Sequence, residues 1–175
     1  MKKSIRLRFA EPSDAAFILS LRLDPSINRY LSEVEDNEMK QREWLLKYKK
    51  REVEGSEFYF IIERSDKTKC GTVRIYDLQE ESFSWGSWIL NEDKTRYAAV
   101  ESALLVYEWG FEKLGYTQSH FEVMKGNTGV IKFHQRMGAE LVGEDAINFY
   151  FRMQKADLQR FRDQFYERVS NAGKS

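Results

Sequence analysis

The sequence is poor in cysteine, histidine and proline, and these shortages exclude several kinds of site. Its one cysteine, Cys70, leaves no disulfide within the chain and argues against a cysteine-based zinc site. The two histidines, His120 and His134, are too few for a metal site built from several imidazoles, so no metal is expected. The two prolines, Pro12 and Pro25, lie near the N-terminus, and no linker-like segment divides the chain. We therefore expect a single domain over residues 1–175.

A charge excess and a long apolar run are also missing. Lysine plus arginine and aspartate plus glutamate each number 28, whereas a nucleic-acid binder usually carries a basic excess. The N-terminal Met-Lys-Lys-Ser-Ile-Arg lacks the apolar run of a signal peptide, and no stretch approaches the roughly 18 apolar residues that span a bilayer. We therefore expect no nucleic-acid partner, no membrane partner and a cytoplasmic location.

What is present is the composition and periodicity of a soluble α/β protein. Hydrophobic residues make up 42% and charged residues 32% of the chain. Apolar runs and alternation predict strands, and apolar residues at helical spacing predict the helices between them. Three consecutive strands with short turns imply an antiparallel meander within a mixed sheet. The expected strands cover 5–9, 58–62, 71–76, 82–90, 119–124, 139–143 and 147–154, and the expected helices follow Pro12, pass through 27–31, and cover 38–53, 95–114, 128–137 and 156–169.

The first candidate for chemistry is the strand-to-helix junction over residues 88–101. A helix N-terminus presents unpaired N–H groups and a positive dipole end, so it suits a phosphate group. Lys94 and Arg96 add positive charge there, and the small pair Ala98-Ala99 would let a ligand approach the backbone. The alternative is an ordinary charged loop, because the segment has no glycine and matches neither a Walker loop nor a dinucleotide fingerprint.

The second candidate is the group of Glu122, Asn127 and His134. The predicted strand, turn and helix can bring these three side chains near one cleft. Glu122 could then act as a general base, directly or through water, if burial raises its pKa towards neutrality. His134 could donate a proton to a leaving group. Each residue alone also has a plain structural interpretation, as a solvated strand residue or a packed helix residue. Trp85 could similarly line a pocket or pack in the core.

Taken together, the element order and these two junctions resemble the GNAT acetyltransferase superfamily, over roughly residues 4–154. The chain is most similar to the branch of ribosomal-protein N-terminal and amino-sugar acetyltransferases. The segments that carry the resemblance are 24–31, Gly71-Thr72-Val73-Arg74-Ile75, 100–104 with Trp109-Gly110-Phe111-Glu112-Lys113-Leu114-Gly115, and 127–139.

The resemblance implies a mostly antiparallel sheet, flanked by helices, with a V-shaped split that receives acetyl-CoA. Lys94, Thr95, Arg96, Tyr97, Ala98 and Ala99 would hold its pyrophosphate, Asn127 its arm, and the N–H groups near Ile89 and Leu90 the acetyl carbonyl. Glu122 takes the position of the general base, and His134 that of the usual tyrosine proton donor. A histidine there would make activity sensitive to pH near 6–7. The expected acceptor contacts are Arg29, Tyr30 and Trp85.

The sequence therefore predicts an N-acetyltransferase that joins acetyl-CoA and a primary amine directly in one ternary complex. The acceptor stays open between a small amine, such as a nucleotide-linked amino sugar, and a protein N-terminus. A non-catalytic ligand-binding or interaction module is the alternative, because Thr95 and Tyr97 stand where the family's loop has glycine. A homodimer that covers Phe161 and Phe165 of the terminal helix is also considered.

Overall fold

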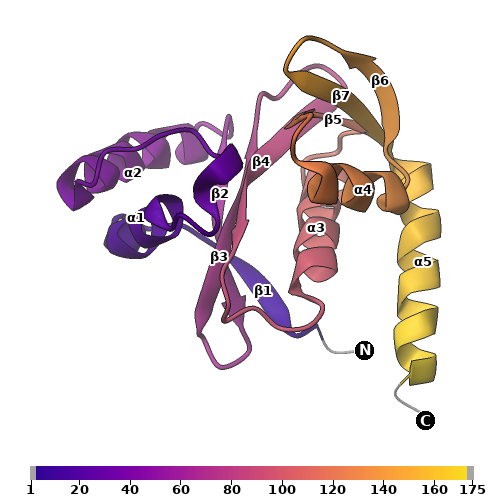
Figure 1. The fold of residues 1–175 in the computed structure, drawn as a ribbon, viewed down its shortest axis with the longest axis horizontal. Coiled ribbons are helices and arrows are strands. Elements are labelled where there is room, and N and C mark those ends of the chain that lie inside the picture. The colour runs from indigo at the N-terminus through magenta and orange to yellow at the C-terminus, as the bar shows by residue number, and fades with distance from the viewer. Residues whose placement is uncertain (1–2, 173–175) are drawn as a thin grey trace. The chain divides into compact units, whose positions relative to one another are not determined.

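The structure, a computed structural model, describes residues 3–172, and these residues form two compact units (Figure 1). The N-terminal unit comprises residues 3–78 and 85–106. The C-terminal unit comprises residues 79–84 and the described residues from 107 onward. The single domain expected over residues 1–175 stays a prediction.

The sheet of the N-terminal unit contains β1 (Ile5–Phe9), β2 (Phe58–Arg64), β3 (Lys69–Tyr76) and most of β4 (Ser82–Leu90). β1 pairs antiparallel with β2, β2 pairs antiparallel with β3, and β3 neighbours β4. Residues 58–63 are all buried. This double-sided burial explains why β2 reads as an unbroken apolar run rather than as an alternation.

Two helices and two short turns of 3₁₀ helix complete the N-terminal unit. The elements are η1 (Pro12–Asp14), α1 (Ala15–Leu23), η2 (Asn28–Tyr30) and α2 (Glu38–Val53). α2 begins after Asn37, whose side chain accepts the N–H of Lys40, and its bounds agree with the predicted helix over 38–53. α1 and α2 lie side by side in Figure 1 and share a core with β2. That core contains Ala10, Ala15, Ile18, Leu45, Tyr48, Tyr59 and Ile61.

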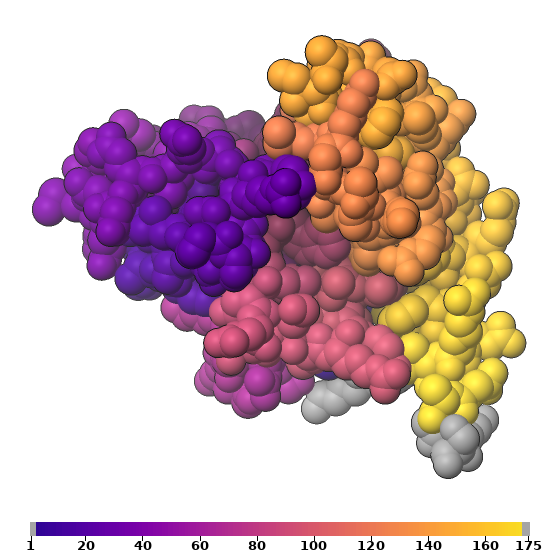
Figure 2. All heavy atoms as spheres, viewed as in Figure 1, coloured from indigo at the N-terminus to yellow at the C-terminus, as the bar shows by residue number. Residues whose placement is uncertain are grey.

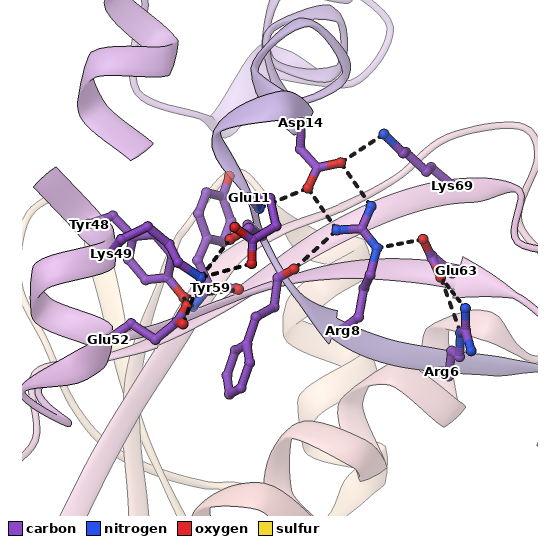
Figure 3. A network of polar contacts seen from close by, with 12 residues as sticks. Arg6, Arg8, Glu11, Asp14, Tyr48, Lys49, Glu52, Tyr59, Glu63 and Lys69 are labelled. Atoms are coloured by element: carbon purple, nitrogen blue, oxygen red, sulfur yellow. Dashed lines mark hydrogen bonds and ion pairs between the residues drawn. The ribbon is translucent and has the colours of Figure 1, made fainter. Parts of the chain in front are cut away.

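A polar network connects η1 to the strands of this unit (Figure 3). The Asp14 carboxylate is 1% exposed and accepts hydrogen bonds from Arg8 at 2.7 and 2.8 Å and from Lys69 at 2.7 Å. Burial opposes ionisation of Asp14, but the bonds from Arg8 and Lys69 outweigh it and hold the pKa of Asp14 well below its ordinary value. Arg8 also donates to Glu63 at 2.6 Å. The charges of this network are matched, so we assign it a structural role.

The C-terminal unit contains the first residues of β4 with β5 (Gln118–Met124), β6 (Glu140–Glu144) and β7 (Asn148–Gln154). β5 pairs antiparallel with β7, which pairs antiparallel with β6. β4 and β5 run parallel and pair only at Ser82↔Gln118 and Phe83↔Ser119. The strand order is therefore β1-β2-β3-β4-β5-β7-β6, a mixed and mostly antiparallel sheet as the sequence predicted.

The central helix differs from its predicted span of 95–114. α3 covers Ala98–Glu108 and continues as a π-helical turn, η3 (Trp109–Lys113). Its start is later because residues 91–97 form turns, in which the N–H of Ala98 donates to the Thr95 carbonyl at 3.1 Å. The predicted stop at Gly115 is confirmed, since Gly115 has a φ of 81° that favours glycine.

Two further helices belong to the C-terminal unit, α4 (Thr128–Met137) and α5 (Lys155–Ala172). α4 has its predicted bounds and ends at Gly138, which has a φ of 103°. α5 buries Leu158 and leaves many of its other side chains exposed, as its yellow spheres in Figure 2 show. Within residues 3–172, no helix is both long enough and apolar enough to span a membrane.

Candidate functional site

A cavity of about 540 Å³ lies in the N-terminal unit, between the end of α1 with its following turn and the segment after β4. This volume falls in the range of small-molecule sites. The cavity brings together Leu90 and Lys94, both predicted as cofactor residues, and adds several residues that the prediction missed. Its lining consists of Ser20, Leu21, Asp24, Ser26, Ile27, Leu90, Asn91, Glu92, Asp93 and Lys94.

Both rims of this cavity are turns held by their own side chains. The Asp24 carboxylate accepts from the N–H of Ser26 at 2.8 Å and from its hydroxyl at 2.6 Å, and these bonds lower the pKa of Asp24. On the other rim, the Asn91 side chain accepts the N–H of Asp93 at 3.0 Å. The Asp-Pro-Ser and Asn-Glu-Asp patterns in the sequence signal such turns, but they do not reveal that the turns face one cavity.

The predicted pyrophosphate segment is organised by a buried carboxylate instead of by glycine. The Thr95 hydroxyl lies 2.6 Å from that of Ser4, which in turn donates to Glu101 on α3. The N–H of Ser4 also donates to both Glu101 oxygens, at 3.2 Å. Glu101 is 1% exposed, so this chain of bonds fixes Thr95 against the start of α3.

Beside Thr95, the segment offers positive charge to solvent. Lys94 and Arg96 are exposed, and the Arg96 guanidinium lies 5.3 Å from the centre of the Tyr97 ring. Ala98 is buried and Ala99 half-buried at the first residues of α3. Exposed cations beside the N-terminus of an 11-residue helix are suited to a phosphate ligand. The residues therefore fit the pyrophosphate of acetyl-CoA, while their contacts with it stay a prediction.

β4 is irregular just before Ile89 and Leu90, the residues predicted to polarise the acetyl carbonyl. Ser87 has a φ of 46°, and its carbonyl accepts the Thr72 hydroxyl at 3.0 Å. A left-handed residue inside a strand interrupts the regular ladder. β3 also lies very close to β4 here, because a Cβ atom on Gly71 would lie 2.1 Å from the Ile89 carbonyl oxygen. The sequence shows Gly71 but not the irregularity at Ser87.

The three predicted acceptor residues fall outside the 540 Å³ cavity. Arg29 is exposed on η2 with its guanidinium 5.3 Å from the centre of the Tyr30 ring. Trp85 is 4% exposed and its ring centre lies 5.4 Å from that of Trp88. The structure therefore brings Arg29 and Tyr30 together and places Trp85 in the interior. Their contacts with an acceptor stay a prediction.

In the C-terminal unit, Asn127 directly precedes α4. Its N–H donates to Met124 at 2.8 Å, and its carbonyl accepts the N–H of Ile131 at 3.1 Å. Its side chain makes no capping hydrogen bond to the helix. The backbone thus fixes Asn127, and its side-chain amide is not used as a cap, which suits the predicted contact with a ligand.

His134 is packed among aromatic rings on the same side of β5 as Phe121. Its ring centre lies 4.3 Å from that of Phe121, 5.6 Å from that of Phe133 and 6.5 Å from that of Phe151. His134 is 4% exposed, and this burial lowers its pKa to about 3. The imidazole is therefore neutral near pH 7, and the sensitivity to pH 6–7 expected of it does not follow from this structure.

Glu122 belongs to the other face of β5. Successive side chains along a strand point to opposite faces, and Glu122 is exposed between the buried Phe121 and Val123. It pairs across the sheet with Tyr150, whereas Phe121 pairs with Phe151. The structure therefore does not bring Glu122 and His134 together on one face, although both lie near Asn127 in the sequence.

Two other kinds of site find no support in residues 3–172. No group of three or more His, Cys, Asp or Glu side chains is arranged to hold a metal ion there. Cys70 is buried on β3, and burial raises the pKa of its thiol to about 11. Because the thiolate is the reactive form, Cys70 is poorly suited to act as a nucleophile.

Comparisons with known proteins identify the family to which the chain belongs. The family model described as "Acetyltransferase (GNAT) domain" matches residues 4–140. The solved structure described as "Apo FdhC- a nucleotide-linked sugar GNAT" is 51% identical, covers 93% of each chain and has a TM-score of 0.87. The chain is a GNAT acetyltransferase. A search of curated proteins finds no significant match to this acetyltransferase.

More distant acetyltransferases support the fold. The ribosomal-protein-S5-alanine acetyltransferase of Vibrio fischeri is 13% identical, with a TM-score of 0.77 over 90% of this chain and 97% of that one. The spermidine N-acetyltransferase of Vibrio cholerae, solved with CoA and spermine, is 17% identical, with a TM-score of 0.77 over 90% and 99%. The family assignment makes this chain an acyltransferase and confirms the predicted class of enzyme.

Proposed function

We propose that this acetyltransferase moves acetyl from acetyl-CoA to the amino group of a nucleotide-linked amino sugar. The observation that carries the proposal is the 51% identity, over 93% of both chains, to a protein described as a nucleotide-linked sugar GNAT. The relatives described as acting on ribosomal protein or spermidine are only 13% and 17% identical and support the fold alone. A protein N-terminus therefore has less support as the acceptor.

Acetyl-CoA would supply an activated thioester, whose aminolysis joins the acetyl carbon to the substrate nitrogen and releases CoA as a thiol. In the N-terminal unit, exposed Lys94 and Arg96 beside the start of α3 would hold the pyrophosphate. Thr95 is positioned for this by Ser4 and Glu101. The interrupted ladder at Ser87 supports the proposed N–H donation to the acetyl oxygen from the residues near Ile89.

In the C-terminal unit, we propose that Asn127 contacts the cofactor arm and that Glu122 removes the amine proton through water. Glu122 is exposed rather than buried as the sequence hypothesis required, so the proposed proton transfer runs through water. The proposed role of His134 starts from a neutral ring, because burial lowers its pKa to about 3. A neutral imidazole N–H can donate a hydrogen bond to the leaving sulfur, which is weaker help than transfer from an imidazolium.

The proposal is tested by offering the purified protein acetyl-CoA with three acceptors in parallel: a nucleotide-linked amino sugar, an N-terminal peptide and spermidine. Release of CoA thiol should be fastest with the amino sugar. Glu122→Gln should lower kcat about tenfold or more while acetyl-CoA affinity stays constant. Glu167→Gln, on exposed α5, is the matched control. Faster turnover with the peptide or spermidine would overturn the proposed acceptor, and an unchanged kcat in Glu122→Gln would overturn the proposed base.

A further inference from the structure

Arg22, near the C-terminal end of α1, is a half-buried arginine with no carboxylate partner among residues 3–172. Its Nη2 donates to the Ser32 carbonyl at 3.1 Å and to the Ser32 hydroxyl at 2.5 Å. Within residues 3–172 it makes no ion pair with a carboxylate. Burial, together with the nearby charge of Arg74, lowers the pKa of Arg22, but a guanidinium stays protonated at any ordinary pH. A partly buried cation with only neutral partners is costly unless a ligand neutralises it.

Arg74 on β3 adds a second incompletely satisfied guanidinium. Its Nη1 donates to Glu57 at 3.2 Å, but Glu57 also accepts from Arg51 at 2.5 Å. The Nε atom of Arg74 is buried without a hydrogen-bond partner in the described part of the chain. In the part of the chain that the structure describes, Glu57 is therefore the one carboxylate bonded to Arg22, Arg51 or Arg74, and the three arginines exceed its charge by two.

A cavity of about 410 Å³ opens beside this group, and Arg22 and Trp44 both line it. The Arg74 guanidinium lies 5.7 Å from the centre of the Trp44 ring, and that of Arg51 lies 5.2 Å from it. Trp44 is half-buried on α2, so part of the indole is open to the cavity. Arg22 lines the cavity itself, whereas Arg51 and Arg74 lie against the Trp44 ring without lining it. The site thus combines a guanidinium, which binds phosphate in a bidentate way, with an aromatic wall against which a base can pack.

The acidic residues of the lining do not cancel this charge. Glu35 pairs with Lys40, and both belong to the lining. Glu33 also lines the cavity, but it is exposed to solvent. Screening by water weakens the effect of an exposed carboxylate on a half-buried guanidinium. The end of the cavity at Arg22 therefore keeps its positive charge.

We propose that Arg22 and Arg74 bind the diphosphate of a nucleotide-linked sugar, with its nucleoside in the cavity lined by Trp44. This inference rests on the proposed function, because it gives the nucleotide part of that acceptor a subsite. The end of α1 contributes Ser20, Leu21 and Asp24 to the 540 Å³ cavity and Arg22 to this second one. The predicted cofactor segment and the nucleotide subsite are thus adjacent to one helix end within the same unit.

The diphosphate of the sugar nucleotide and that of CoA could both bind to these arginines, so the experiment distinguishes the two. Isothermal titration measures the binding of dTDP, UDP, thymidine and acetyl-CoA, each alone, to the wild type, Arg22→Gln and Arg42→Gln. Arg42 is exposed on α2, and Arg42→Gln removes the same charge as Arg22→Gln, so this variant is the matched control. The inference predicts that Arg22→Gln weakens dTDP or UDP binding about tenfold or more while acetyl-CoA affinity is unchanged. Arg42→Gln should bind all ligands as the wild type does.

Several results would overturn the inference. Equal affinity of wild type and Arg22→Gln for both nucleoside diphosphates would do so, as would thymidine binding as tightly as dTDP. A parallel loss of acetyl-CoA affinity in Arg22→Gln would assign the arginines to CoA instead. If Arg22→Gln melts at a lower temperature than the wild type, Arg22→Lys is measured in its place, because it keeps the charge but loses the planar fork of the guanidinium. Its diphosphate affinity must then fall below that of the wild type.

The outcome is distinguishable from failure of the proposed function. Loss of dTDP binding in Arg22→Gln, with no acetylation of any nucleotide-linked amino sugar by the wild type, would support the subsite and refute the proposed reaction. Acetylation of such a sugar with the same KM in the wild type and Arg22→Gln would support the reaction and refute the subsite.

Discussion

Replacing His134 with phenylalanine is predicted to make the fold less sensitive to acid. The imidazole is 4% exposed and packs on the rings of Phe121, Phe133 and Phe151. Burial lowers its pKa from an ordinary value of 6.5 to about 3. A phenylalanine ring fits these apolar surroundings and cannot take up a proton.

The size of the effect follows from the two pKa values of His134. As the pH falls below 6.5, the unfolded chain binds a proton at this histidine and the folded chain does not, until the pH approaches about 3. The stability linked to the neutral ring is therefore fully present above pH 6.5 and is lost as the pH falls. Each pH unit in this window costs about 1.4 kcal/mol, so the wild type loses about 2 kcal/mol between pH 6.5 and 5 through His134 alone.

The assay is urea-induced unfolding of the wild type, His134→Phe and His120→Asn, near pH 7 and about pH 5. Other groups titrate in all three proteins, so the comparison between variants isolates each histidine. The free energy of unfolding of the wild type should fall by about 2 kcal/mol more than that of His134→Phe over this range. A parallel loss in the wild type and His134→Phe would refute the reasoning and show that His134 titrates in the folded state near its ordinary pKa.

Three further predictions concern the supports of the site. Gly71→Ala should destabilise the protein by about 1–3 kcal/mol in urea unfolding, because its Cβ would lie 2.1 Å from the Ile89 carbonyl oxygen; unchanged stability would contradict that close approach. Asp14→Asn should cost about 2 kcal/mol near pH 7, since Arg8 loses its buried partner. This difference should shrink progressively as the pH falls below the ordinary pKa of aspartate and vanish only near the much lower pKa that Asp14 has in the fold. Glu101→Gln should raise the Kd for acetyl-CoA several-fold in calorimetry. An unchanged Kd would show that this carboxylate does not position the predicted cofactor segment for binding.

Most elements of the fold could be predicted because their signals are local. The alternation in residues 5–9 and the helical spacing in 38–53 and 128–137 gave elements close to those observed. The first residue of α3 could not be predicted from such local spacing. Turns at residues 91–97 delay it to Ala98, and the apolar spacing of the helix extends only from that point.

The candidate site was less predictable because it depends on which face a side chain occupies. Spacing around Asn127 suggested that Glu122 and His134 act together, but the two-residue period of β5 separates them. The sequence leaves open whether a segment with Thr95 and Tyr97 in place of glycine binds the cofactor. The structure shows a bond chain from Ser4 to buried Glu101 that fixes this segment, and its binding of the cofactor stays a prediction. That contact joins residues far apart in sequence, so no local pattern reveals it. No local pattern indicates Arg22 either, because its lack of a carboxylate partner within residues 3–172 is visible only in three dimensions.

The most direct test of the proposed function is the mass of the product. The protein, acetyl-CoA and a nucleotide-linked amino sugar are incubated together, and the sugar nucleotide is analysed by mass spectrometry. The proposal predicts a gain of one acetyl group on the sugar nitrogen, absent when the amine is replaced by a hydroxyl. An unchanged sugar nucleotide, together with an acetylated N-terminal peptide under the same conditions, would contradict it.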